Sequence, residues 1–111
     1  KLLTLPAQLL RAGEESTAYF SWCKVIKAVE LTERVLAVEI LMATQGMDIV
    51  AHALPEFSFG AGTDAARQCL RRRVATLTEN RFMSPDMAAA LELLQQGAVL
   101  AAAEVAVGAL Q

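Results

Sequence analysis

The stretch from Ser16 to about Ala53 constrains the fold most, because its pattern is that of one long helix. It contains no proline and one glycine, Gly46, and its centre from Val35 to Thr44 is apolar on nearly every face, as in a buried helix. About 38 residues at 1.5 Å per residue give roughly 57 Å, whereas a compact domain of this size is roughly 35 Å across. We therefore expect the helix to protrude from any globule that this chain could form alone, and to need neighbours from other chains or from missing sequence.

Composition agrees with a helical architecture. Hydrophobic residues make up 55% of the 111 residues and aromatic residues only 5%, and side chains that are mostly small or branched favour helix–helix packing. We predict an all-α fold: a long central helix plus two or three shorter helices, forming part of an oligomeric helical bundle. Residues 1–111 are expected to form a single helical region. Its helices are predicted at about 16–53, 64–77, 86–96 and 98–109.

The local signals for the shorter helices are glycine, proline and capping residues. Thr63 is the predicted cap of the second helix, which follows the loop of residues 55–62. Ser84-Pro-Asp86 is typical of a helix start, with serine as the cap and proline at the first helical position. Gly97 is expected to break or kink the chain between the last two helices.

The two halves of the long helix differ in their polarity. Charged residues step by three through the first half, forming a stripe opposite an apolar face. The second half has no polar face, so we expect it to be the most deeply enclosed part. Glu39 places a charge in this apolar part. We interpret it as a partner in an inter-helix salt bridge or as an edge residue, in preference to a catalytic carboxylate.

Charge and hydropathy exclude several classes of function. A formal net charge of -2 argues against a dedicated nucleic-acid binder, and the run Arg71-Arg-Arg73 reads as a solvated or salt-bridging surface in preference to an anion site. The first ten residues lack a signal-peptide pattern, and the apolar runs fall short of the roughly 18 residues of a membrane span. We expect a cytoplasmic protein with no membrane or nucleic-acid partner. Because the chain starts at Lys1 and not at Met, we expect it to begin inside a longer protein or after processing.

The remaining reactive residues give weak signals. Cys23 and Cys69 are read as two buried thiols in preference to a disulfide. His52, the single histidine, has no ligand or nucleophile at a suitable spacing and is expected at the surface near the helix end. Gly60-x-Gly62 is more typical of a turn into a helix than of a phosphate-binding loop. No metal site and no cofactor-binding residue is predicted.

Four short segments, in order, give the sequence its specificity. They are Glu33-Arg-Val-Leu-Ala-Val-Glu-Ile-Leu-Met-Ala-Thr-Gln-Gly-Met-Asp48, Gly60-Ala-Gly-Thr63, Asn80-Arg-Phe-Met-Ser-Pro-Asp-Met87 and Gly97-Ala-Val-Leu-Ala-Ala102. Their order and spacing resemble the C-terminal part of the histidine and aromatic amino-acid ammonia-lyases. The resemblance covers about two thirds of the chain, from about Glu30 to Ala102.

The resemblance implies an all-α fold in which the long helix is a rod in the central bundle of a homotetramer. It also implies non-oxidative elimination of ammonia from histidine or an aromatic amino acid by the parent enzyme. The electrophile of that family is a methylidene-imidazolone made from an Ala-Ser-Gly tripeptide, which precedes this region in the family and is absent here, as are the family's catalytic tyrosines. This chain alone is therefore expected to be inactive.

One catalytic carboxylate of the family is expected near the start of the long helix, in an Asn-Gln-Glu-Asp-like motif. A gapless match that keeps Pro6 and Ser16 places the motif's Gln and Glu on Arg11 and Ala12, so that the carboxylate is lost. A shift of two residues puts Glu14 in its place. We favour the gapless match because it preserves both flanks, and Glu14 remains the candidate catalytic residue. Under either match the motif's Asn and Gln are missing.

Three functions compete. The first is a segment of an ammonia-lyase-like protein that supplies oligomer contacts and active-site walls, partnered by further copies or by the rest of the parent chain. The second is a non-catalytic helical oligomerisation module derived from that family. The third is a small enzyme using Glu14, Glu39 and His52, which is disfavoured because Glu14 and His52 would lie tens of ångströms apart along one helix.

Overall fold

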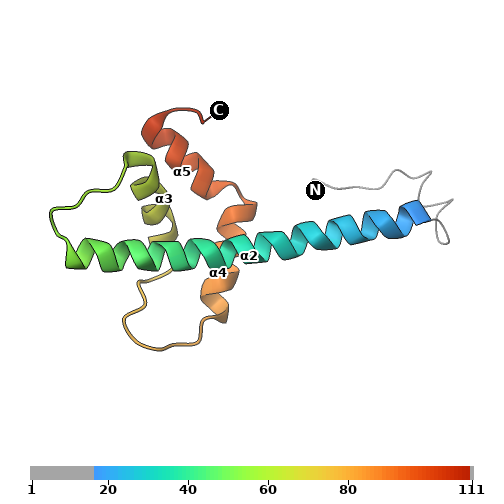
Figure 1. Ribbon diagram of the computed structural model, residues 1–111, viewed down its shortest axis with the longest axis horizontal. Coiled ribbons are helices and arrows are strands. Elements are labelled where there is room, and N and C mark those ends of the chain that lie inside the picture. The colour runs from blue at the N-terminus through green and yellow to red at the C-terminus, as the bar shows by residue number, and fades with distance from the viewer. Residues whose placement is uncertain (1–16, 111) are drawn as a thin grey trace. The chain divides into compact units, whose positions relative to one another are not determined.

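A computed structural model describes residues 17–110 of the chain. These residues form four helices, α2 (Thr17–Ala53), α3 (Ala61–Arg71), α4 (Ser84–Gln95) and α5 (Ala98–Val107), and contain no β-strand (Figure 1). The predicted all-α class is thereby confirmed. Contacts divide the chain into two units, residues 1–32 and 33–111, and the division falls inside α2.

The described part of the first unit is the N-terminal half of α2. Two of its contacts are local: Lys27 and Glu30 approach to 3.9 Å at the helix surface, and the rings of Tyr19 and Phe20 meet edge to face. Cys23 is exposed, which corrects the expectation of a buried thiol at that position. The reason is its place on a stretch of helix where most side chains are exposed.

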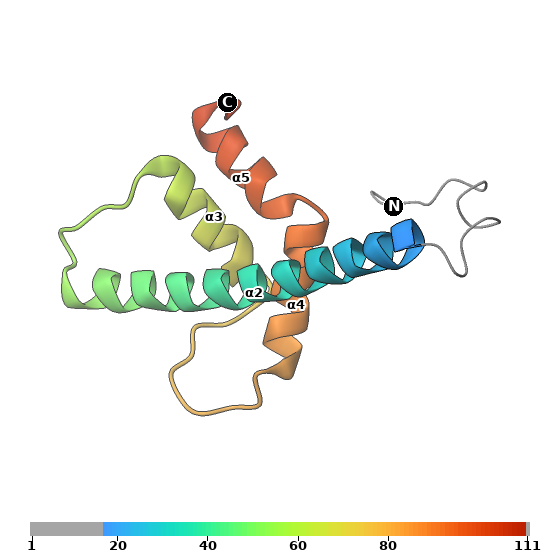
Figure 2. The ribbon, with the colours of Figure 1, turned by 45° about the vertical axis from the view of Figure 1, so that its right-hand side comes forward.

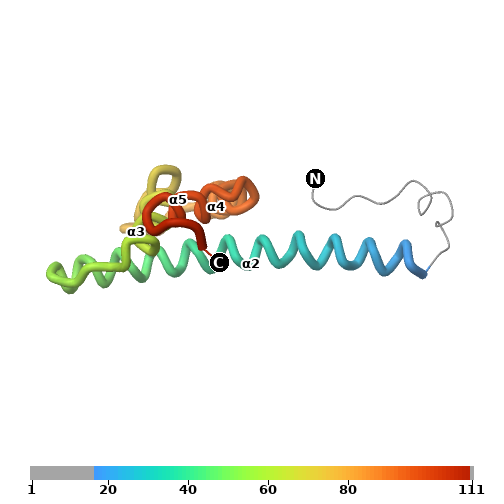
Figure 3. The backbone as a smooth tube through the Cα atoms, turned by 90° about the horizontal axis from the view of Figure 1, so that it is seen from above, coloured from blue at the N-terminus to red at the C-terminus, as the bar shows by residue number. Residues whose placement is uncertain are grey.

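The second unit holds the hydrophobic core. Figure 3 shows α3, α4 and α5 on the same side of the C-terminal half of α2. The buried apolar side chains come from α2, α3, the turn after α3, and α4, and are Ala37, Leu41, Cys69, Leu70, Val74, Ala90 and Leu93. Because all three short helices lie on one side of α2, they cover a single face of it.

Within this chain, one face of the second half of α2 is covered. Within this chain the buried residues of α2 are Ala37, Leu41 and Thr44, which lie on one helix face. Large apolar side chains on the other faces are exposed, namely Val35, Leu36, Val38, Met42, Ile49 and Val50. Glu39 is exposed as well. The composition of α2 is that of a buried helix, but within this chain α3, α4 and α5 cover one of its faces.

Helix α3 begins and ends earlier than predicted. It starts at Ala61 after Gly60, so Thr63 lies inside the helix and is not its cap. It stops at Arg71 and not at Leu77, because the chain turns after Leu70. We call the twelve residues from 72 to 83 the connector.

Helices α4 and α5 meet at the predicted break. Gly97 has a φ of +71°, a left-handed conformation that suits glycine, and the two helices are bent by 60° at this point (Figure 2). The start of α4 at Ser84 is two residues earlier than predicted, with Asp86 in its first turn. Helix α5 ends at Val107, before the positive φ of Gly108, and not at residue 109.

Gly62 allows α3 and α5 to approach closely. A Cβ atom at this position would lie 3.3 Å from Cγ1 of Val107 and 3.9 Å from the carbonyl oxygen of Ala103. The first contact is tighter than ordinary van der Waals distance, so a larger side chain here would push the two helices apart.

Length and composition leave α2 able to cross a membrane, contrary to the prediction that no run is long enough. Its most apolar window of 18 residues has a mean hydropathy of 1.3, and 17% of that window is buried. The bent pair α4 and α5 passes the same test when taken together.

Candidate functional site

The structure does not assemble the residues that were candidates for catalysis. Glu14, Arg11 and Ala12 lie outside the described residues. Glu39 and His52 are both exposed on α2, and thirteen residues of helix place them about 20 Å apart. His52 lies in the last turn of α2, as predicted. Among residues 17–110, no group of three or more potential metal ligands comes together.

A different polar cluster joins α2, α3 and the connector. Its centre is Asp48, whose Oδ1 accepts a hydrogen bond from Nη1 of Arg67 at 2.7 Å. The second oxygen, Oδ2, accepts from Nε of Arg71 at 2.7 Å and from Oγ1 of Thr76 at 2.8 Å. The side chains of Asp48, Arg67 and Arg71 are 12%, 22% and 16% exposed, so the cluster is largely shielded from water.

Each arginine of the cluster has further partners. Nη2 of Arg67 donates to Oδ1 of Asp64 at 2.9 Å, and its guanidinium lies 5.5 Å from the centre of the Phe59 ring. Nη1 of Arg71 donates to the backbone carbonyls of Val74 and Ala75 at 3.1 and 3.3 Å. Arg71 therefore ties the start of the connector to α2 through Asp48.

Gln45 fastens the middle of the connector. Its Nε2 donates to the carbonyl of Leu77 at 2.9 Å, and its Oε1 accepts from the backbone N–H of the same residue at 3.0 Å. These two bonds satisfy both backbone groups of Leu77, so the connector needs no helical hydrogen bond there. Leu77, the predicted last residue of the second helix, is thus held in the connector by Gln45.

The end of the connector is held by Arg81. Its Nη2 donates to the carbonyl of Ala75 at 2.6 Å, and its Nε donates to Oδ2 of Asp86 at 2.9 Å. Arg73 forms an ion pair with Glu92 at 2.8 Å. Salt bridges by Arg71 and Arg73 confirm the prediction that the arginine run is a salt-bridging surface.

The charges of the cluster shift its ionisation. Burial raises the pKa of Asp48, but hydrogen bonds from Thr76 and Arg67 together with the charge of Arg71 outweigh burial and hold that pKa below the ordinary value of 3.8. Hydrogen bonds to Asp48 and Asp64 raise the pKa of Arg67 above its ordinary value. Asp48 is therefore a stable anion at neutral pH, already engaged by three donors, and suits fastening and not proton transfer.

The sequence contained a signal for this cluster that the search for catalytic motifs missed. Gln45 and Asp48 are three residues apart on α2, and Arg67 and Arg71 are four apart on α3. Each pair shares a helix face. An acidic residue on one predicted helix and two arginines on one face of another indicate an inter-helix ion pair, although they do not identify which helices meet.

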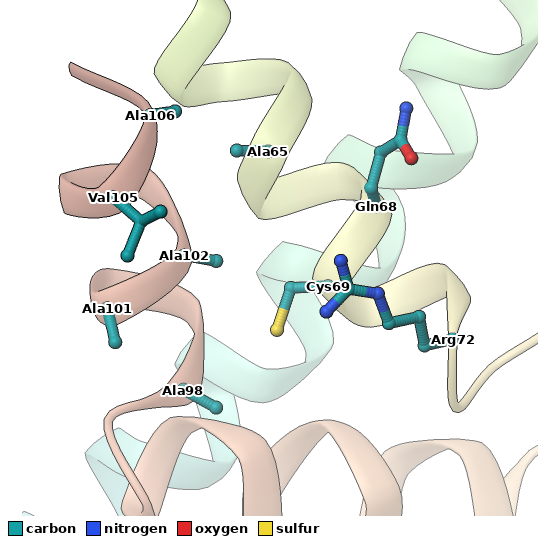
Figure 4. A pocket seen from close by; sticks show the side chains of 9 residues that line it. All are labelled: Ala65, Gln68, Cys69, Arg72, Ala98, Ala101, Ala102, Val105 and Ala106. Carbon is teal, nitrogen blue, oxygen red and sulfur yellow. The ribbon is translucent and has the colours of Figure 1, made fainter.

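A hollow with a volume of about 600 Å³ lies between α3 and α5 (Figure 4). We call it the α3–α5 groove. Figure 4 shows alanine side chains of α5 facing the groove, with Cys69 and Arg72 on the α3 side toward its Ala98 end. Its lining residues are Ala65, Gln68, Cys69, Arg72, Ala98, Ala101, Ala102, Val105 and Ala106. Neither a nucleophile with a base nor a pair of carboxylates lines this groove.

The curated proteins that this chain matches include histidine ammonia-lyases from three bacteria. The chain is 38% identical to the histidine ammonia-lyase of Sorangium cellulosum over 107 residues, which cover 96% of this chain and 20% of that protein. It is 36% identical to the histidine ammonia-lyase of Symbiobacterium thermophilum, over 79% of this chain and 17% of that protein. It is 34% identical to the histidine ammonia-lyase of Salmonella choleraesuis, over 86% of this chain and 18% of that protein.

The chain thus spans about a fifth of the length of the curated relatives that it matches. No protein-family model matches it, and no solved structure matches it significantly.

Proposed function

Because the chain belongs to the histidine ammonia-lyase family, we propose that it is a C-terminal helical segment of an ammonia-lyase, which supplies oligomer contacts and walls of the active site. The proposal rests mainly on 38% identity that extends across 96% of the chain. The parent enzyme would eliminate ammonia from histidine and leave an unsaturated acid, urocanate. An aromatic amino acid is the alternative substrate suggested by the wider family resemblance.

The residues of this chain do not supply the family's electrophile. The Ala-Ser-Gly tripeptide that forms the methylidene-imidazolone does not occur in the sequence. We therefore assign no chemical step to this segment, and its role in the proposal is structural. Glu14 is retained as the candidate carboxylate that the segment would contribute to an active site completed by the rest of the parent protein.

Oligomer assembly is proposed from the uncovered faces of α2. Met42 is 70% exposed, Ile49 60% and Val35 59%, on a helix whose centre is apolar on nearly every face. Patches of this kind are typical of protein–protein interfaces. We propose that further copies of the chain, in a homotetramer, or other parts of the parent protein cover these faces.

We propose a soluble, cytoplasmic location on two grounds. The relatives are named as histidine ammonia-lyases. In addition, the apolar half of α2 carries Asp48, which pairs with charged residues of α3 and not with an apolar neighbour. In this proposal the exposed apolar faces of α2 are covered by protein and not by lipid.

A second candidate function is a non-catalytic oligomerisation module derived from the lyase family. The observation in its favour is the sequence Leu10-Arg-Ala-Gly-Glu-Glu15, which lacks the Asn and Gln of the family's catalytic motif. The two candidates differ in whether the longer protein turns over an amino acid.

The test is the formation of urocanate from histidine by the longer protein that contains this segment, followed by its ultraviolet absorbance. The lyase proposal predicts turnover, and Glu14→Gln should lower it strongly if that carboxylate acts in catalysis. The variant Glu15→Gln is the matched control beside it. Absence of turnover with histidine and with aromatic amino acids, by a correctly assembled protein, would favour the non-catalytic module.

A further inference from the structure

A second hollow, with a volume of about 290 Å³, lies at the surface of α3 and shares two lining residues with the α3–α5 groove. Its lining consists of polar side chains from α3 and from the residue that follows it, namely Arg67, Gln68, Arg71 and Arg72. Residues four apart on a helix lie on the same face, so three guanidinium groups and one amide converge on a small volume. We call it the arginine hollow.

Two of these arginines are already fixed by the polar cluster around Asp48. Oδ1 of Asp48 binds Arg67 and Oδ2 binds Arg71, each at 2.7 Å. Asp64 also holds Arg67, at 2.9 Å. A guanidinium has five N–H donors, and the side chain of Arg67 forms three hydrogen bonds within the chain. Neither carboxylate lines the arginine hollow, so donors on that side remain open to a ligand.

The charges around the arginine hollow leave one positive charge unmatched. The carboxylates of Asp48 and Asp64 balance the two fixed guanidinium groups. In the described part of the chain, the Arg72 side chain is exposed and takes part in no ion pair and no hydrogen bond. The whole chain carries a formal net charge of -2, so it should not attract anions in general. An anion that binds beside α3 must be recognised locally.

We propose that the arginine hollow binds a phosphate group, either inorganic phosphate or a phosphate carried on a larger molecule. Arginine offers planar forks of donors that match phosphate oxygens. Arg72 supplies the unmatched charge, whereas Arg67 and Arg71 are held in place before the ligand arrives, which lowers the entropy lost on binding. This site lies outside the elimination chemistry of the proposed function and does not depend on it.

Two features of the arginine hollow oppose tight binding. The last turn of α3 carries partial negative charge from the helix dipole. In addition, Asp48 and Asp64 already occupy donors of the same arginines. Binding therefore depends on the Coulomb attraction of the exposed Arg72, which salt screens. We expect the affinity for phosphate to fall as the ionic strength rises.

The experiment is titration of the whole chain with inorganic phosphate at neutral pH and low ionic strength, followed by calorimetry and by the backbone amide shifts in nuclear magnetic resonance. The proposal predicts saturable one-to-one binding with the largest shifts at Gln68 and Arg72. Acetate at the same ionic strength should bind more weakly. Tighter binding of phosphoserine than of inorganic phosphate would assign a phosphate monoester as the ligand, and the reverse order would assign free phosphate.

Arg72→Gln removes the unmatched charge and should weaken phosphate binding about tenfold or more. Arg72→Lys keeps the charge but loses the fork of donors, so it should weaken binding less. The matched control is Arg34→Gln on α2. It removes another exposed arginine that forms no ion pair in the described part of the chain and does not line the arginine hollow. This control should bind phosphate as the wild type does, and circular dichroism checks that each variant is helical.

Three results would overturn the proposal. The first is a folded wild-type chain that binds no phosphate, or binds it no more tightly than acetate. The second is an equal affinity of the wild type and Arg72→Gln, because the bound phosphate would then lie elsewhere. The third is an equal loss in Arg72→Gln and Arg34→Gln, which would show attraction by positive charge in general and not a site.

Discussion

Nε of Arg71 lies 2.7 Å from Oδ2 of Asp48, and this contact joins two helices across 23 residues of sequence. The same guanidinium donates to two backbone carbonyls of the connector. One side chain therefore fixes α3, α2 and the connector together. Because the two charged groups are 16% and 12% exposed, water cannot readily replace either partner.

Removal of the Asp48 charge should destabilise the second unit. Asp48→Asn keeps the shape of the side chain, leaves the guanidinium of Arg71 without its anion and leaves Arg67 with Asp64 alone. We expect the free energy of unfolding in urea to fall by about 2–3 kcal/mol.

The matched control is Glu30→Gln. The Lys27–Glu30 pair is separated by 3.9 Å, with side chains 65% and 55% exposed, and its loss should change stability by less than about 0.5 kcal/mol. Equal effects of the two substitutions would contradict the assigned role of Asp48.

The contribution of Asp48 should also depend on pH. Its pKa in the folded chain lies below the unfolded value of 3.8. Its stabilising effect is therefore complete well above pH 3.8 and is lost as the pH falls through that value toward the folded pKa. Urea unfolding between about pH 7 and pH 3 should show the wild type and Asp48→Asn converging in acid. A stability difference that does not change with pH would refute this assignment.

Gly62→Val should disturb the packing of α3 on α5. A Cβ atom alone would approach Val107 to 3.3 Å, and the extra methyl groups of valine require the helices to separate. We expect a loss of about 1–3 kcal/mol in the free energy of unfolding. Gly62→Ala should be nearly neutral, because the gain in helix propensity offsets a contact with a side chain that can move.

Gly46 is the contrasting position. No atom lies within 4 Å of a Cβ built there, and the residue is inside α2. Gly46→Ala should stabilise the chain by about 0.5–1 kcal/mol, because alanine lowers the entropy lost on helix formation. A destabilised Gly46→Ala measured in the same urea series would show that another chain packs closely against this position.

Met42→Glu should weaken the assembly proposed for α2 while leaving the single chain folded. Its side chain is 70% exposed, so the substitution buries no charge in the monomer. In an apolar interface the same carboxylate is desolvated, and association should weaken by tenfold or more, about 1.4 kcal/mol or above. Lys24→Glu, on the charged stripe of the same helix, is the control, and equal weakening by both variants would speak against the apolar face.

Local sequence signals predicted where the helices lie better than they predicted which residues contact them. The absence of proline gave the extent of α2, and Gly97 gave the bend before α5. The path of the connector could not be predicted, because its residue Leu77 is bound by Gln45, which is 32 residues away. A tertiary contact of that separation leaves no periodic pattern in the sequence.

Enclosure of α2 by neighbours outside this chain stays a prediction, because composition reports what a helix needs and not which element supplies it. The polar cluster was missed for a related reason. Asp48 lies in an apolar run and Arg67 on another helix, so neither residue alone indicates a site. The family resemblance was confirmed by the relatives, whereas the position of Glu14 in the fold lies outside the described residues.

The mass of the wild-type chain in solution tests the central claim most directly. If the segment is built for a multi-chain lyase assembly, analytical ultracentrifugation should find a multiple of 11.9 kDa, and the assembly should weaken in Met42→Glu. A folded wild-type chain that sediments as a single 11.9 kDa species at all concentrations would contradict the claim that further copies of this chain cover α2.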